Sequence, residues 1–136
     1  MREGYGIPCS QDACSKTLEA QYSQLRPLIH EDDIIISSNP WITHYYLGGV
    51  DGFLREKIVP TGYAQFGNPT DEYFGIPLFD SQEELRQLRE LDQRVWIIVD
   101  YKARVFSSPE TLELIERTYT KHQESTLMAV YASPSQ

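Results

Sequence analysis

Basic residues, cysteines and long apolar runs are all scarce in this chain of 136 residues. Its apolar runs, such as Val95–Val99, are far shorter than the ~20 residues that a membrane-spanning helix requires. The first residues, Met1–Tyr5, carry one charge of each sign and no apolar segment, so we expect no signal peptide. These features predict a soluble chain.

The shortage of positive charge limits the choice of partners. Twelve Lys and Arg residues stand against twenty Asp and Glu residues, which gives a net charge of −8 and a pI near 4.8. Proteins that bind nucleic acids draw much of their affinity from Lys and Arg side chains that neutralise phosphates. The basic residues here are scattered singly, mostly beside acids. We therefore expect neither nucleic acid nor an anionic membrane surface as a partner.

The two cysteines, Cys9 and Cys14, do not form part of a zinc motif. A structural zinc site takes about four ligands, and the three histidines, His30, His44 and His122, lie far from both cysteines. The residues between the two cysteines could loop far enough for a disulfide. A disulfide and two free thiols both remain open from the residues alone.

Periodicity divides the chain into an arm or linker at residues 1–14 and a single domain at residues 15–136. From Ser15 onward, apolar residues recur at spacings that match one helical face. Asp33–Ser38 is a β-branched run that is apolar on both faces, as in a buried parallel strand. Asn39-Pro40 then supplies a helix cap with Pro in the first turn, and Gly48-Gly49 supplies a stop.

The rest of the chain continues the alternation of strands and helices. We expect strands within 56–63, 74–80, 94–100 and 125–131, and helices that begin at Ser81 and Ser108. Pro77 favours an edge position for strand 74–80. The pattern predicts a three-layer α/β fold with a mainly parallel open sheet, helices on both faces and strand 94–100 at the centre. Such a fold is Rossmann-like or flavodoxin-like.

Ligands of open parallel sheets bind beyond the carboxyl ends of the strands, where Asn39, Asp80 and Asp100 are expected. Asp80 and Asp100 could share a hard cation such as Mg²⁺. The simpler interpretation is that Asp80 helps to begin a helix and Asp100 ends a strand. We therefore expect no metal, no cofactor and no catalytic residue in this chain.

The short helix after Asn39 is rich in aromatic residues. At helical spacing Trp41 and Tyr45 share one face, and Ile42 and Tyr46 share another. One face must pack on the sheet, and the other could present an aromatic ring and an imidazole to a sugar ring, although such residues more often belong to the core. The glycine-rich turn 48–52 lacks a phosphate-binding motif. The candidate ligand-binding residues are Asn39, Trp41, His44, Tyr45, Tyr46, Asp51, Asp80 and Asp100.

Three segments resemble a known family. Glu31–Pro40, Tyr45–Gly49 and Arg94–Asp100 are similar to parts of the soluble C-terminal domain of polytopic GT-C type glycosyltransferases, those related to the dolichyl-phosphate-mannose–protein mannosyltransferases. The tails of that family carry an acid-led hydrophobic strand, a helix with Tyr-Tyr-Leu-Gly, and an Arg-x-Trp strand. The resemblance covers about residues 18–131.

The resemblance implies a location on the extracytoplasmic side of a membrane and catalysis in a membrane portion that uses a polyprenyl-phosphate sugar. No catalytic residue of the family carries over to this chain. The implied role is a non-catalytic accessory domain that positions an acceptor or binds a partner. That partner would be the membrane portion of the same polypeptide, a glycan or a polyprenyl-phosphate sugar.

An oxidising compartment would also favour a disulfide between Cys9 and Cys14. The alternative to the resemblance is a freestanding cytosolic α/β protein that binds a small metabolite or regulates a partner. The reading frame upstream of residue 1 separates the two hypotheses, since only the first requires membrane spans there.

Overall fold

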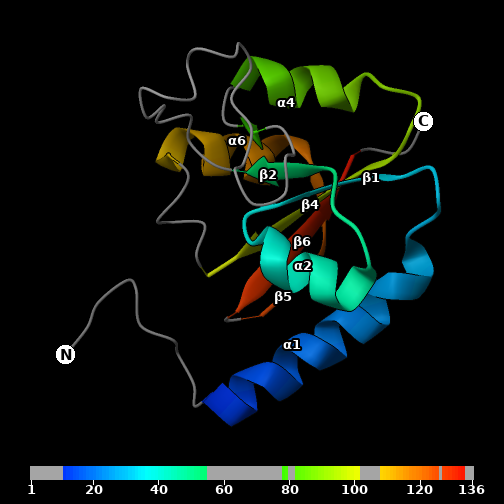
Figure 1. Ribbon diagram of the computed structural model, residues 1–136. Helices are drawn as coiled ribbons and strands as arrows, with labels where there is room; N and C mark the ends of the chain where they lie inside the picture. The colour runs from blue at the N-terminus through cyan, green and yellow to red at the C-terminus, as the bar shows by residue number, and fades with distance from the viewer. Residues whose placement is uncertain (1–10, 55–77, 80–81, 102–107, 126, 134–136) are drawn as a thin grey trace, which may run out of the picture.

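The computed structural model describes residues 11–54, 78–79, 82–101, 108–125 and 127–133. Figure 1 shows their arrangement. The elements in chain order are α1 (Gln11–Leu25), the 3₁₀ turn η1 (Arg26–Leu28), β1 (Ile34–Ser37), α2 (Pro40–Leu47), β2 (Gly52–Leu54), β3 (Leu78–Phe79), α4 (Gln82–Arg89), β4 (Val95–Asp100), α6 (Pro109–Thr118), β5 (Thr120–Glu124) and β6 (Met128–Ala132). None of the described helices is long and apolar enough to cross a membrane.

The six strands form one sheet in the order β3-β2-β1-β4-β6-β5. The pairs β3–β2, β2–β1 and β1–β4 are parallel, whereas β4–β6 and β6–β5 are antiparallel. The expectation of a mainly parallel Rossmann-like or flavodoxin-like sheet is therefore wrong. The class is α/β, but the sheet is mixed and ends in an antiparallel hairpin.

The hairpin explains why the sheet is mixed. Only Tyr119 separates α6 from β5, and only residues 125–127 separate β5 from β6. A connection this short can join antiparallel strands, whereas parallel neighbours need a crossover of a dozen or more residues. The strand β5, with the sequence Thr-Lys-His-Gln-Glu, is mostly exposed and has no apolar face. It therefore lacks the hydrophobic periodicity by which a strand is recognised.

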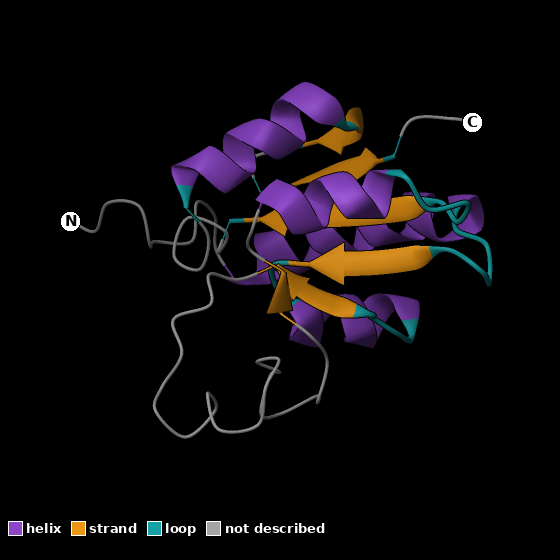
Figure 2. Cartoon of the chain, turned by 90° about the horizontal axis from the view of Figure 1, so that it is seen from above, coloured by secondary structure: helices purple, strands orange, loops and turns teal. Residues whose placement is uncertain are grey.

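Helices pack on both faces of the sheet, as Figure 2 shows from above. On one face, α1 and α2 cover a core that includes Tyr22, Leu25 and Trp96. On the other face, α4 and α6 cover a core that includes Leu85 and Ile115. The strand β4 lies between β1 and β6 and is buried along most of its length. The expectation that strand 94–100 is central is confirmed.

The local helix signals are confirmed where the structure describes them. The side chain of Asn39 accepts a hydrogen bond from the backbone N–H of Ile42, and Pro40 occupies the first turn of α2. Ser108 caps α6 by accepting from the backbone N–H of Thr111 at 3.2 Å. The leading helix begins at Gln11, four residues before its expected start.

Several other expectations concern residues that lie outside the described part of the chain. The Ser81 cap, Asp80 and strand 56–63 lie outside the described residues. Cys9 does so as well, whereas Cys14 lies in α1. The Cys9–Cys14 disulfide therefore stays a prediction.

Replacing Gly48 with alanine is expected to lower the free energy of unfolding by about 1–2 kcal/mol. Gly48 ends α2 with a left-handed φ of 84°, and an L-residue with a Cβ is strained in that conformation. A Cβ at either Gly48 or Gly49 would meet no other atom within 4 Å, so the strain is confined to the backbone. Gly49→Ala, at a position without a left-handed φ, is the matched control. Equal losses for the two variants in urea denaturation would contradict this account of the helix end.

Candidate functional site

The carboxyl ends of β1 and β4 meet in a buried polar cluster. Ser38 Oγ donates to Asp100 Oδ1 at 2.9 Å, and Asn39 Nδ2 donates to Asp100 Oδ2 at 2.8 Å. The backbone N–H of Asp100 donates to Ser38 Oγ at 2.8 Å. All three residues are buried, and Asp100 is only 7% exposed. The two strand-end candidates Asn39 and Asp100 therefore meet, but both carboxylate oxygens accept hydrogen bonds from the protein.

A second polar network fixes α2 to its neighbours. The hydroxyls of Tyr22 and Thr43 lie 2.9 Å apart, and those of Ser37 and Thr43 lie 2.6 Å apart. The Tyr22 ring also stacks on Tyr46, with centroids 4.9 Å apart and planes 13° from parallel. Burial raises the pKa of the Tyr22 phenol well above its ordinary value, so this hydroxyl stays protonated. Sequence reasoning missed Thr43, whose polar side chain on the inward face of α2 was the available signal.

The outward face of α2 carries Trp41, His44 and Tyr45, which we call the aromatic stripe. Tyr45 is 78% exposed and Trp41 is 41% exposed. The Trp41 ring meets Phe53 edge-on at a centroid distance of 5.7 Å, which orients the indole at the surface. By contrast, Ile42 packs against the core on the inward side. The predicted division of this helix into two faces is confirmed.

Tyr46 lies between the aromatic stripe and the core. Its ring meets the Tyr45 ring edge-on at 4.9 Å while it stacks on Tyr22. Partial burial is the main cause that raises the pKa of the Tyr46 phenol, with smaller effects from the charges of Glu19 and Tyr45. Tyr46 therefore supports the stripe from beneath as a neutral side chain.

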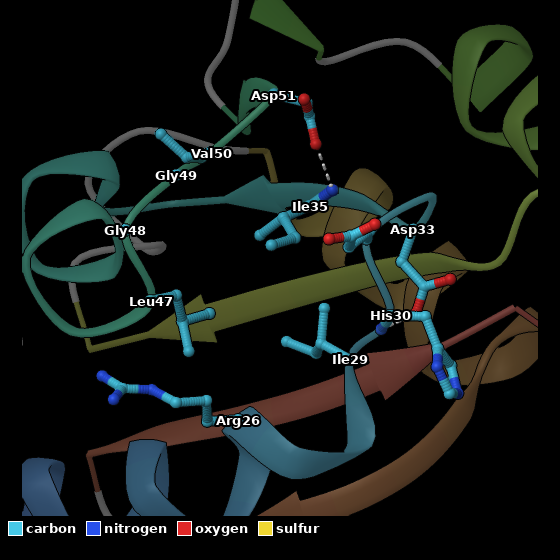
Figure 3. Close-up of a pocket in the computed structure, with 11 residues that line it drawn as sticks. Arg26, Ile29, His30, Asp33, Ile35, Leu47, Gly48, Gly49, Val50 and Asp51 are labelled. Atoms are coloured by element: carbon cyan, nitrogen blue, oxygen red, sulfur yellow. Dashed lines mark hydrogen bonds between the residues drawn. The ribbon is translucent and has the colours of Figure 1, made fainter.

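A pocket of about 360 Å³ lies at the carboxyl end of α2 (Figure 3). The buried cluster, with Asn39 as the N-cap, lies at the other end of this helix. The walls of the pocket come from η1 and the turn after it, the first half of β1 and the turn that follows α2. The apolar lining residues are Ile29, Ile35, Leu47 and Val50, and the charged or titratable ones are Arg26, His30, Glu31, Asp33 and Asp51. This volume falls within the ~300–1,000 Å³ that is typical of small-ligand sites.

Two pocket carboxylates are held by the sheet. The backbone N–H of Asp51 donates to the carbonyl of Ile35 at 2.7 Å, and its Oδ2 accepts from the backbone N–H of Ile35 at 2.8 Å (Figure 3). Asp33 Oδ2 accepts from the backbone N–H of His30 and from Trp96 Nε1, both at 2.9 Å. The expected candidate Asp51 therefore lines the pocket together with Asp33, which sequence reasoning missed. The acidic run Glu31-Asp32-Asp33 directly before β1 was the available signal.

Within the described ranges, no group of three or more His, Cys, Asp or Glu side chains is arranged to hold a metal ion. Asp80, the expected partner of Asp100, lies outside those ranges. The described candidates therefore fall into three places: the buried cluster, the aromatic stripe and the pocket. No family model, curated protein or solved structure matches this chain.

Proposed function

We propose that this chain is a non-catalytic accessory domain of a membrane-embedded glycosyltransferase, and that the aromatic stripe on α2 is its contact surface for an acceptor glycan. The segments that carry the resemblance form β1, α2 and β4 and the residues next to them. Of these, α2 places two aromatic rings and an imidazole at the surface. That exposed stripe is the observation that carries the proposal.

The construction of α2 suits a recognition surface. Its inward side is fixed through Thr43 to both α1 and β1, so the rings outside stand on a rigid support. Aromatic side chains supply a large contact area and lose little conformational freedom on binding. A flat exposed ring such as Tyr45 can stack on the apolar face of a sugar.

The buried cluster supports a non-catalytic role. Glycosyl transfer requires a base to activate the acceptor and a group that stabilises the departing phosphate. The Asp100 carboxylate accepts from Ser38 and Asn39, and none of the described residues of the cluster is Lys or Arg. In the proposal, the base and the group that stabilises the phosphate both belong to the membrane portion of the same polypeptide. The domain would then lie on the extracytoplasmic face of the membrane.

Titration of the ¹⁵N-labelled domain with candidate glycans, and separately with polyprenyl-phosphate head groups, tests the proposal. We expect chemical-shift changes at Trp41, His44 and Tyr45. We also expect Tyr45→Ala to weaken glycan binding by about tenfold or more, the usual range for an aromatic contact that anchors an interface. The matched control is Leu91→Ala, because Leu91 is also exposed but follows α4 on the other face of the sheet. Shift changes confined to α4 and α6, or equal effects of the two variants, would overturn the proposal.

The pocket favours a second candidate function, a freestanding protein that binds a small metabolite. The gene distinguishes the two, because an accessory domain requires membrane spans encoded upstream in the same reading frame. A stop codon with a ribosome-binding site directly upstream would favour the freestanding protein and a cytosolic location.

A further inference from the structure

The pocket beside α2 combines an apolar lining with an excess of negative charge. Among the described residues that line it, Glu31, Asp33 and Asp51 contribute three carboxylates, against the guanidinium of Arg26 and the imidazole of His30. Arg26 donates to the main-chain carbonyl of Tyr46 in the last turn of α2, which holds its side chain against that helix.

The position of α2 adds to this negative potential. The helix ends at Leu47 and is capped by Gly48, and both residues line the pocket. The carboxyl end of a helix carries a partial negative charge, which favours a cation nearby. An anionic ligand would therefore be repelled, and a neutral one would gain nothing from the excess of carboxylates.

The apolar lining sets the other requirement. Ile29, Ile35 and Leu47 are partly buried and pack against the core, so they form a firm surface. A ligand without an apolar part would leave these side chains uncovered, whereas a compact ring would remove them from water.

We propose that this pocket binds small organic cations, with a protonated amino group among the carboxylates and a compact apolar body against Ile29, Ile35 and Leu47. Asp51 is oriented for this task, because one of its carboxylate oxygens is fixed by the backbone N–H of Ile35. Glu31 contributes charge from the exposed turn before β1. The proposal depends on the pocket alone and is independent of the function proposed for the aromatic stripe.

Three probes of one shape separate charge from apolar contact: cyclohexylamine, cyclohexanol and cyclohexanecarboxylate. Each is titrated at constant ionic strength into the ¹⁵N-labelled full chain. We expect saturable shift changes at Gly48–Asp51 with cyclohexylamine, with a dissociation constant of about 1 mM, as suits a ligand this small. Cyclohexanol should bind at least about tenfold more weakly, and the carboxylate should not bind.

Substitutions of single carboxylates test which of them contribute to amine binding. Glu31→Gln and Asp51→Asn should each weaken amine binding by about threefold to tenfold and leave cyclohexanol binding unchanged. Asn at position 51 retains an oxygen that can accept from the Ile35 N–H, and Glu31→Gln serves independently if the first variant does not fold. Asp92→Asn, which removes an exposed carboxylate outside the pocket, is the control.

Equal affinity for the three probes, or no saturable shifts in the pocket with the amine, would overturn the proposal. So would full amine binding by Glu31→Gln. The glycan titration probes a different surface, because Tyr45 does not line the pocket. Failure of one proposal can therefore be distinguished from failure of the other.

Discussion

Asp100→Ala is expected to lower the free energy of unfolding by about 3 kcal/mol. The substitution removes the acceptor for the Ser38 hydroxyl and for the Asn39 amide inside a buried cluster. A buried donor without a partner costs about 1–3 kcal/mol, and more when the lost partner is charged. The same hydrogen bonds connect the end of β1 to the end of β4, so their loss weakens the sheet as a whole. Urea denaturation followed by circular dichroism measures the change in the free energy of unfolding.

Two further variants make this result specific. Asp100→Asn should cost less than Asp100→Ala, because the amide oxygen can still accept one of the two hydrogen bonds. Asp92→Ala, at an exposed position in the turn before β4, should change stability by no more than about 0.5 kcal/mol. A loss below about 1 kcal/mol for Asp100→Ala would mean that water replaces the carboxylate. That result would contradict the account of the cluster as a structural link between the ends of β1 and β4.

Trp96→Ala is expected to have the larger effect, a loss of about 3–5 kcal/mol. Trp96 is fully buried in the central strand, and its Nε1 donates to Asp33 at 2.9 Å. The Arg94 guanidinium lies 4.8 Å from the ring centroid. Truncation would leave a large cavity beneath α1 and also remove the donor that holds Asp33 at the pocket. The free energy of unfolding from urea titration measures the loss.

The control for Trp96 is the other tryptophan of the chain. Trp41 is 41% exposed, so Trp41→Ala should cost much less, while the remaining Trp96 fluorescence reports a buried indole that becomes exposed on unfolding. Trp96→Phe retains most of the apolar volume and loses the hydrogen bond to Asp33. It should therefore fall between wild type and Trp96→Ala. Comparable losses for Trp41→Ala and Trp96→Ala would contradict the core as described.

The parts of the fold that could be predicted from the sequence are those encoded within a few neighbouring residues. Asn39, Pro40 and Gly48 mark both ends of α2 because capping depends on side chains next to the helix end. The strand Val95–Asp100 is recognised as central because it is apolar on both faces. By contrast, the polar strand Thr120–Glu124 has no local signature, and its place in the sheet follows from its hairpin with β6.

The candidate site divides in the same way. The two faces of α2 follow from helical spacing, whereas the exposure of Tyr45 follows from the packing of the opposite face, with Ile42, against the core. The pocket could not be predicted, because the parallel pairing of β1 with β2 brings Asp51 beside β1, and Arg26 reaches the end of α2 through its hydrogen bond to the Tyr46 carbonyl. Nor does spacing show that the carboxylate of Asp100 is occupied by hydroxyl and amide donors more than sixty residues away along the chain.

The insertion of β6 between β4 and β5 has a consequence for synthesis on the ribosome. The chain emerges from its N-terminus, so β4 and β5 are made before the strand that separates them. Until residues 128–133 emerge, β5 lacks the neighbour with which it pairs, and β4 presents an open edge along its most apolar length. The backbone N–H and carbonyl of Val95 acquire their partners only with Ser133. A nascent chain halted before Met128 would therefore expose an unpaired apolar strand edge, the kind of surface that chaperones shield and that otherwise pairs with a second chain.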